Sequence, residues 1–151
     1  MKKILFVLLA VAFLLTSCAD MEGGLAGNNR FSFEGATRSI ERAVVSQTGD
    51  NYTFELYSDT NGKPNDYFIA LTFPASLNDT LFTVPTASGN WNVRGAVEGI
   101  AFTGNRSGRK GFQSMNVQIK TIDGAGTYEL MFSLALEDNR CMKGYYKGRM
   151  N

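Results

Sequence analysis

Apolar side chains recur at every second position through much of the last third of the chain. Every second residue is apolar over 115–120 and again over 128–136. Because successive side chains of a strand point to opposite faces, this period of two predicts half-buried β-strands. Turn-forming sequences at 123–126 (DGAG) and 138–139 (DN) separate these segments from each other and from a last segment over 141–150. The pattern predicts a three-stranded antiparallel meander.

The rest of the chain also consists of short apolar segments separated by polar turn sequences. Further strands are predicted over 31–33, 40–47, 52–57, 67–73, 80–84, 91–95 and 97–103. Residues 36–46 have a partly helical spacing, but their β-branched side chains and the following turn favour a strand. Parallel βαβ units need crossover helices, which this pattern lacks. We therefore expect an all-β fold, a single antiparallel sandwich or barrel-like domain of about 8–10 strands.

Composition narrows the classes of function. The chain has 151 residues, enough for one domain with a core of its own. Its 15 basic and 14 acidic side chains give a net charge of +1, which argues against a nucleic-acid-binding protein. The chain has no histidine, so it lacks the commonest proton shuttle and a common metal ligand. We expect a non-enzymatic protein without a cofactor or a metal.

The first 17 residues have the features of a secretory signal peptide. Lys2 and Lys3 are followed by twelve apolar residues, Ile4 to Leu15. At a helical rise of ~1.5 Å per residue, this run is too short to cross a hydrocarbon core of ~30 Å. A positive start, a short apolar run and small residues after it are typical of a signal peptide.

The sequence Leu15-Thr16-Ser17-Cys18 resembles the lipobox of bacterial lipoproteins. The resemblance implies cleavage before Cys18 and acylation of its sulfur, which leaves Cys18 as the lipid-anchored N-terminus. Several acyl chains, each worth ~0.8 kcal/mol per buried methylene, make such an anchor durable. In this family an Asp directly after the cysteine favours inner-membrane retention in some bacteria. Here that position is Ala19, which favours the outer membrane, at its periplasmic or surface face. The chain as a whole resembles the small all-β lipoproteins of Gram-negative envelopes.

The resemblance divides the chain into a signal peptide over 1–17, a glycine-rich flexible tether over 18–29 and the all-β domain over 30–151. Cys18 and Cys141 are the only cysteines. If the sulfur of Cys18 is a thioether, it has no bond left for a disulfide, and Cys141 is then a solitary thiol.

Two groups of residues are candidates for binding a glycan or a protein partner. The glycine-studded loop 104–111 carries three cations, Arg106, Arg109 and Lys110, and its free backbone amides suit a sulfate or phosphate group. Trp91, Tyr145 and Tyr146 offer aromatic faces that can stack on sugars or anchor a protein. Tyr145 and Tyr146 are adjacent on a predicted strand, so we expect one of them to lie away from the core.

Other motifs leave alternatives open. Gly89-Asn90-Trp91 is similar to the Gly-x-Trp motif of lipocalins, so a barrel that carries a small apolar ligand is the alternative function. Ser107 and Lys110 match Ser-x-x-Lys, but the companion motifs of penicillin-binding enzymes are absent. The polar turn over 59–66 is a weak candidate for calcium. A glycosidase would need two facing carboxylates, and spacing alone selects no pair among Glu55, Glu98, Glu129 and Glu137.

Overall fold

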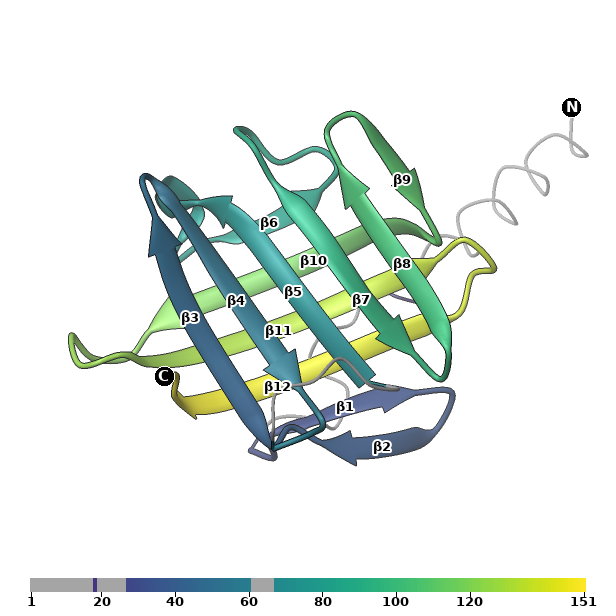
Figure 1. Ribbon diagram of the computed structural model, residues 1–151, viewed down its shortest axis with the longest axis horizontal. Coiled ribbons are helices and arrows are strands. Elements are labelled where there is room, and N and C mark those ends of the chain that lie inside the picture. The colour runs from purple at the N-terminus through teal and green to yellow at the C-terminus, as the bar shows by residue number, and fades with distance from the viewer. Residues whose placement is uncertain (1–17, 19–26, 61–66) are drawn as a thin grey trace, which may run out of the picture.

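A computed structural model describes residues 18, 27–60 and 67–151. The predicted signal peptide, most of the predicted tether and much of the candidate calcium turn lie outside the described residues. The described chain forms two six-stranded antiparallel sheets, A and B, which pack face to face (Figure 1). The prediction of an all-β fold is confirmed, and of its two alternatives, a sandwich or a barrel-like domain, the structure is the sandwich.

Sheet A has the strand order β2-β1-β12-β11-β10-β6. The predicted meander of β10, β11 and β12 forms its centre. The long strand β11 pairs with β10 on one side and β12 on the other, both antiparallel. The strands of this sheet are β1 (Arg30–Phe33), β2 (Ala36–Ser39), β6 (Leu81–Val84), β10 (Phe112–Thr121), β11 (Thr127–Leu136) and β12 (Cys141–Arg149).

Sheet B has the order β3-β4-β5-β7-β8-β9, and all its neighbouring strands are antiparallel. A short 3₁₀ turn, η1 (Ala75–Leu77), follows β5 and leads the chain to sheet A. The strands of sheet B cross those of sheet A at a steep angle (Figure 1). They are β3 (Arg42–Thr48), β4 (Asn51–Tyr57), β5 (Tyr67–Pro74), β7 (Asn92–Val97), β8 (Ile100–Asn105) and β9 (Gly108–Lys110).

Aromatic rings fill the space between the sheets. Phe54 of β4 meets Tyr128 of β11 edge-to-face, with ring centroids 5.1 Å apart. Phe73 of β5 contacts Phe82 of β6 at 5.2 Å. Such pairs add to the stability that burial of their apolar area already gives. They also occupy the interior that a lipocalin-like carrier would leave open for its ligand.

Three inward-facing glycines make room for these rings. A Cβ atom at Gly95, Gly104 or Gly144 would lie 2.4 Å or less from a ring atom. The rings that cover them are those of Phe102, Phe112 and Phe132, respectively. Glycine in a strand often marks such a close approach, and here it lets large side chains pack flat against the sheet.

Two hairpins turn on a Glu-Gly pair. Glu34 and Gly35 join β1 to β2, and Glu98 and Gly99 join β7 to β8. All four residues have positive φ, from 47° to 82°. Two central residues with positive φ in a two-residue loop match the type I′ turn, whose twist suits a hairpin.

The strand predictions differ from the structure mainly at the short edge strands. The structure has twelve strands among its described residues, because β2 and β9 join the predicted set. The break predicted near Gly95 is wrong, since β7 continues to Val97 and turns at Glu98. Among the described residues, none forms a helix of sufficient length and hydropathy to span a bilayer.

Candidate functional site

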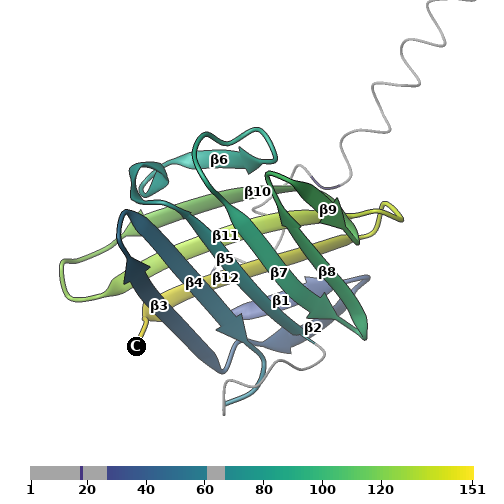
Figure 2. The same ribbon diagram turned by 45° about the horizontal axis from the view of Figure 1, so that its top comes forward.

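An open hollow lies where the β8–β9 hairpin meets the loop between β6 and β7. These two segments lie side by side at one end of the sandwich (Figure 2). The hollow has a volume of about 390 Å³, which is within the usual size range of small-molecule sites. We call it the hairpin hollow. It is lined by Pro85, Thr86, Ala87, Trp91, Asn105, Arg106, Ser107, Gly108 and Arg109.

Arg106 connects the β8–β9 hairpin to the β6–β7 loop by two hydrogen bonds. Its Nε donates a hydrogen bond to the carbonyl oxygen of Gly89. Its Nη2 donates to the carbonyl oxygen of Ala87, at 3.3 Å. Two bonds to backbone oxygens hold the planar guanidinium in one orientation, and no described carboxylate forms an ion pair with it.

The turn that carries Arg106 is fixed by its neighbour Asn105. The side-chain oxygen of Asn105 accepts hydrogen bonds from the backbone amides of Ser107 and Gly108, at 2.8 and 3.1 Å. Asparagine at the start of a turn often makes such bonds to its own following backbone. On the other strand of the hairpin, Nη1 of Arg109 donates to the carbonyl oxygen of Gln113. Both arginines are therefore positioned by local hydrogen bonds.

Trp91 forms part of the wall of the hairpin hollow and also belongs to the core. Its side chain is only 3% exposed and meets the ring of Phe112 edge-to-face at 6.5 Å. Its indole Nε1–H is buried and has no hydrogen-bond partner among the described residues. A buried donor left unpaired costs roughly 1–3 kcal/mol. Trp91 is thus a core residue with an unsatisfied polar atom at the site.

The hairpin hollow is positively charged. Its lining includes two arginines and no carboxylate. Two other arginines differ from those of the hollow, because Arg94 forms an ion pair with Glu55 and Arg140 forms one with Asp138. Glu137 lines a neighbouring depression that shares Gly108 and Arg109 with the hollow. The arrangement can bind an anionic group but offers no acid–base pair.

The structure separates the other candidate residues from this site. Lys110 lines a different shallow depression, with Ala101, Phe102 and Thr103. Tyr146 packs against the core between the sheets, and its hydroxyl donates to the carbonyl oxygen of Arg149 at 2.8 Å. Tyr145 lies on the outer face of sheet A, away from the main core as predicted, but it is only 4% exposed. The interpretation of Tyr145 as an exposed binding residue is therefore wrong.

Tyr145 has its own polar partner. Its hydroxyl donates a hydrogen bond to Oε1 of Glu129, at 2.8 Å. Burial raises the pKa of Tyr145, and the hydrogen bond to Glu129 raises it further. With Met131 it forms a small apolar cluster on the outer face of sheet A. Its role in the structure is packing on that face.

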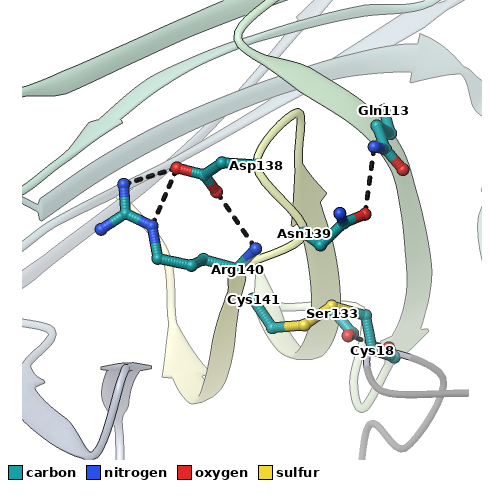
Figure 3. The surroundings of a disulfide bond; sticks show 7 residues. All are labelled: Cys18, Gln113, Ser133, Asp138, Asn139, Arg140 and Cys141. Carbon is teal, nitrogen blue, oxygen red and sulfur yellow. Dashed lines mark hydrogen bonds and ion pairs between the residues drawn. A yellow bond between two sulfur atoms is a disulfide. The ribbon is translucent and has the colours of Figure 1, made fainter. Parts of the chain in front are cut away.

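The same outer face holds Cys18. The sulfur of Cys18 is bonded to that of Cys141, the first residue of β12 (Figure 3). The hydroxyl of Ser133, which is buried, donates to the carbonyl oxygen of Cys18. In this state Cys141 is not the solitary thiol that the sequence predicts. One sulfur cannot carry both a disulfide and a thioether, so the disulfide and the lipidated form are exclusive states of Cys18.

The predicted tether is fixed at both of its ends. Besides the bond at Cys18, the side chain of Asn29 exchanges two hydrogen bonds with the backbone of Lys147, at 2.7 and 3.2 Å. The backbone oxygen of Asn29 accepts a third bond from Ile40. These bonds hold Cys18 and Asn29 to the domain, while residues 19–26 of the predicted tether lie outside the described part of the chain.

Among the described residues, three of the four candidate glutamates interact with different partners. Glu55 lies on the outer face of sheet B with Arg94, whereas Glu129 lies on the outer face of sheet A with Tyr145. Glu98, which lies in the turn between β7 and β8, accepts a hydrogen bond from the hydroxyl of Tyr67 at 2.8 Å. No cluster of three metal-binding side chains occurs among residues 18, 27–60 and 67–151.

Comparison of the chain with protein-family models, curated proteins and solved structures found no match.

Sequence reasoning identified Trp91, Arg106 and Arg109 but missed the groups that hold them. The carbonyl groups of Ala87 and Gly89 carry no sequence signal, since any residue supplies one. Asn105 does carry a signal, because Asn followed two and three residues later by Ser and Gly is typical of a turn. The contact between the hairpin and the β6–β7 loop depends on sheet order, which no local pattern gives.

Proposed function

We propose that this protein is a lipid-anchored lipoprotein of the bacterial envelope whose β-sandwich is a non-enzymatic binding module. Cys18 is the lipid attachment point, and the hairpin hollow is the ligand site. The ligand class is a glycan rather than a protein, because a hollow of about 390 Å³ accommodates a sugar-sized group. The location is the outer membrane, at its periplasmic or surface face.

One observation carries the binding half of the proposal. The hairpin hollow gathers Trp91, Arg106 and Arg109 from two separate connections of the fold, and local hydrogen bonds hold both arginines. Residues recruited from distant parts of the chain to one hollow are typical of a binding site. The absence of histidine and the lack of a carboxylate in the lining argue for binding without catalysis.

The alternative function, a lipocalin-like carrier, has less support. A carrier needs an unfilled apolar interior. Here buried aromatic side chains from the two sheets meet in the interior, with ring centroids as close as 5.1 Å. The hairpin hollow is polar and lies outside this core, so an apolar ligand would gain little from it.

The anchoring half of the proposal is tested by membrane fractionation of two variants. Cys18→Ala removes the proposed lipid site, and we expect it to move the protein from the membrane to the soluble fraction. Cys141→Ala is the matched control, because it also removes the disulfide but leaves the sulfur of Cys18. We expect Cys141→Ala to stay in the membrane fraction. Retention of both variants in the membrane would overturn lipid anchoring at Cys18.

The binding half is tested on an array of bacterial envelope glycans. We expect the full-length protein, purified in nonionic detergent, to be retained on a subset of the array. Trp91→Ala, Arg106→Gln and Arg109→Gln should each reduce this retention. Binding that all three variants keep unchanged would place the site elsewhere, and no retention on any glycan would overturn the proposed module.

A further inference from the structure

We propose that the hairpin hollow recognises an oxyanion on an acidic glycan, a carboxylate or a phosphate group, which binds between Arg106 and Arg109. The inference rests on the proposed function and adds the chemistry of the group that is bound.

Arg106 presents a donor that the protein does not use. Its Nε and Nη2 donate to the carbonyl oxygens of Gly89 and Ala87, while Nη1 donates to no described residue. The two bonds fix the plane of the guanidinium before a ligand arrives. A donor that is already positioned loses little conformational entropy on binding, which favours affinity.

Arg109 completes the pair from the second strand of the hairpin. Its Nη1 donates to the carbonyl oxygen of Gln113, and its Nε and Nη2 donate to no described residue. Both arginines line the same hollow. Guanidinium groups match the geometry of carboxylate and phosphate oxygens, and hydrogen bonds between such charged groups are about twice as strong as neutral ones.

The electrostatics of the site favour an anion over a neutral sugar. Arg94 is bonded to Glu55 at 3.0 Å and Arg140 to Asp138 at 2.6 Å, so the fold neutralises these two cations internally. Within the described part of the chain, the two arginines of the hairpin hollow bond only to neutral carbonyl groups. None of the described residues that line the hollow is a carboxylate, so a bound anion meets no like charge from them.

Trp91 joins the hollow to the core of the sandwich. It is among the residues that line the hollow, but its side chain is only 3% exposed. Its Nε1 is buried and has no hydrogen-bond partner among the described residues. The two arginines therefore supply the recognition, and Trp91 is close enough to the hollow to respond to a change there.

The experiment uses the single tryptophan of the chain as the reporter. The full-length protein in nonionic detergent is titrated at constant ionic strength with inorganic phosphate, with glucuronate and with glucose, and the fluorescence of Trp91 is recorded. The test variant is Arg106→Gln/Arg109→Gln, which removes both charges and keeps side chains of moderate size. The matched control is Lys120→Gln/Lys147→Gln, which removes two exposed charges outside the hollow.

We expect phosphate or glucuronate to shift the fluorescence saturably and glucose to leave it unchanged. The arginine variant should raise the Kd by about tenfold or more, and the lysine variant should bind as the wild type does. A response to phosphate alone assigns the bound oxyanion as a phosphate group, and a response to glucuronate alone assigns it as a carboxylate.

Two results of the titration would overturn the inference. One is the absence of a saturable response to either anion. The other is an equal loss of affinity in the arginine and lysine variants, which would show nonspecific attraction to net charge. Retention of neutral glycans on the array, unaffected by Arg106→Gln and Arg109→Gln, would refute the oxyanion inference while the proposed binding module stood.

Discussion

Gly144 lies directly opposite Phe132 across the β11–β12 ladder, and the phenyl ring covers its backbone. A Cβ atom at position 144 would be 2.2 Å from Cε1 of this ring. Phe132 is fully buried and also approaches Phe31 of β1, so the ring has no open space to move into. The central hairpin of sheet A therefore depends on the absence of a side chain at position 144.

The first prediction concerns this contact. Gly144→Ala is expected to lower the free energy of unfolding by about 1–3 kcal/mol, because the new methyl group overpacks a filled core. The matched control is Gly124→Ala, where a Cβ atom would meet nothing within 4 Å. Urea denaturation of both variants makes the comparison. Equal stabilities of the two variants would contradict this view of the core.

The second prediction concerns stability at high pH. The folded protein raises the pKa of Tyr145 above the ordinary value of 10.0, chiefly through burial and then through the bond to Glu129. The protonated phenol is therefore favoured in the folded state. Its contribution is fully present below pH 10 and is lost as the pH rises through the higher folded pKa.

We therefore expect the free energy of unfolding to fall above pH 10, and to fall less steeply in Tyr145→Phe, which cannot ionise. Tyr57, Tyr128 and Tyr146 also have raised pKa values, so part of the slope should remain in that variant. Urea denaturation at several alkaline pH values measures both slopes. A slope that Tyr145→Phe leaves unchanged would be inconsistent with the buried phenol.

The third prediction concerns the disulfide. In oxidised, non-lipidated protein that begins at Cys18, the bond to Cys141 closes a loop across 123 positions of sequence. Such a link restricts the unfolded chain, so Cys141→Ser should lower the free energy of unfolding by about 2–4 kcal/mol. A reducing agent should abolish the difference between wild type and variant. A difference that persists under reduction would assign the effect to packing at position 141 instead.

The fourth prediction concerns the turn that carries Arg106. Asn105→Ala removes the acceptor for two backbone amides, so it should cost about 1 kcal/mol and loosen the hairpin locally. Hydrogen exchange should accelerate at Ser107 and Gly108 and stay constant in the β10–β12 meander. Asn92→Ala, at an exposed position outside the hollow, is the control. Unchanged exchange at Ser107 would mean that Asn105 does not hold the turn.

Long alternating segments were the most predictable part of the fold. The β10–β12 meander follows directly from its period of two, because a one-residue shift would turn its apolar side chains toward solvent. The short edge strands β2 and β9 were missed, since neither contains a buried residue that would create a pattern. The turn at Glu98 was missed because Asn or Asp, rather than Glu, usually precedes glycine in such hairpins.

The candidate site was predictable in its residue types but not in its assembly. Arg106 and Arg109 stand out in a glycine-rich loop, and Trp91 stands out as the only tryptophan. Their meeting at one hollow results from the packing of the β8–β9 hairpin against the β6–β7 loop, a contact between segments distant in sequence. Tyr145 and Tyr146 share a strand but face opposite sides of sheet A, so the structure separates them from the site.

The central claim is that the sulfur of Cys18 carries lipid in the membrane-bound protein. Mass spectrometry of peptides from protein extracted from membranes, alkylated without prior reduction, tests it directly. The account predicts an N-terminal peptide that begins at Cys18 with the added mass of acyl chains, and an alkylated Cys141. A peptide that retains residues 1–17, or an unacylated Cys18 joined to Cys141 by a disulfide, would contradict it.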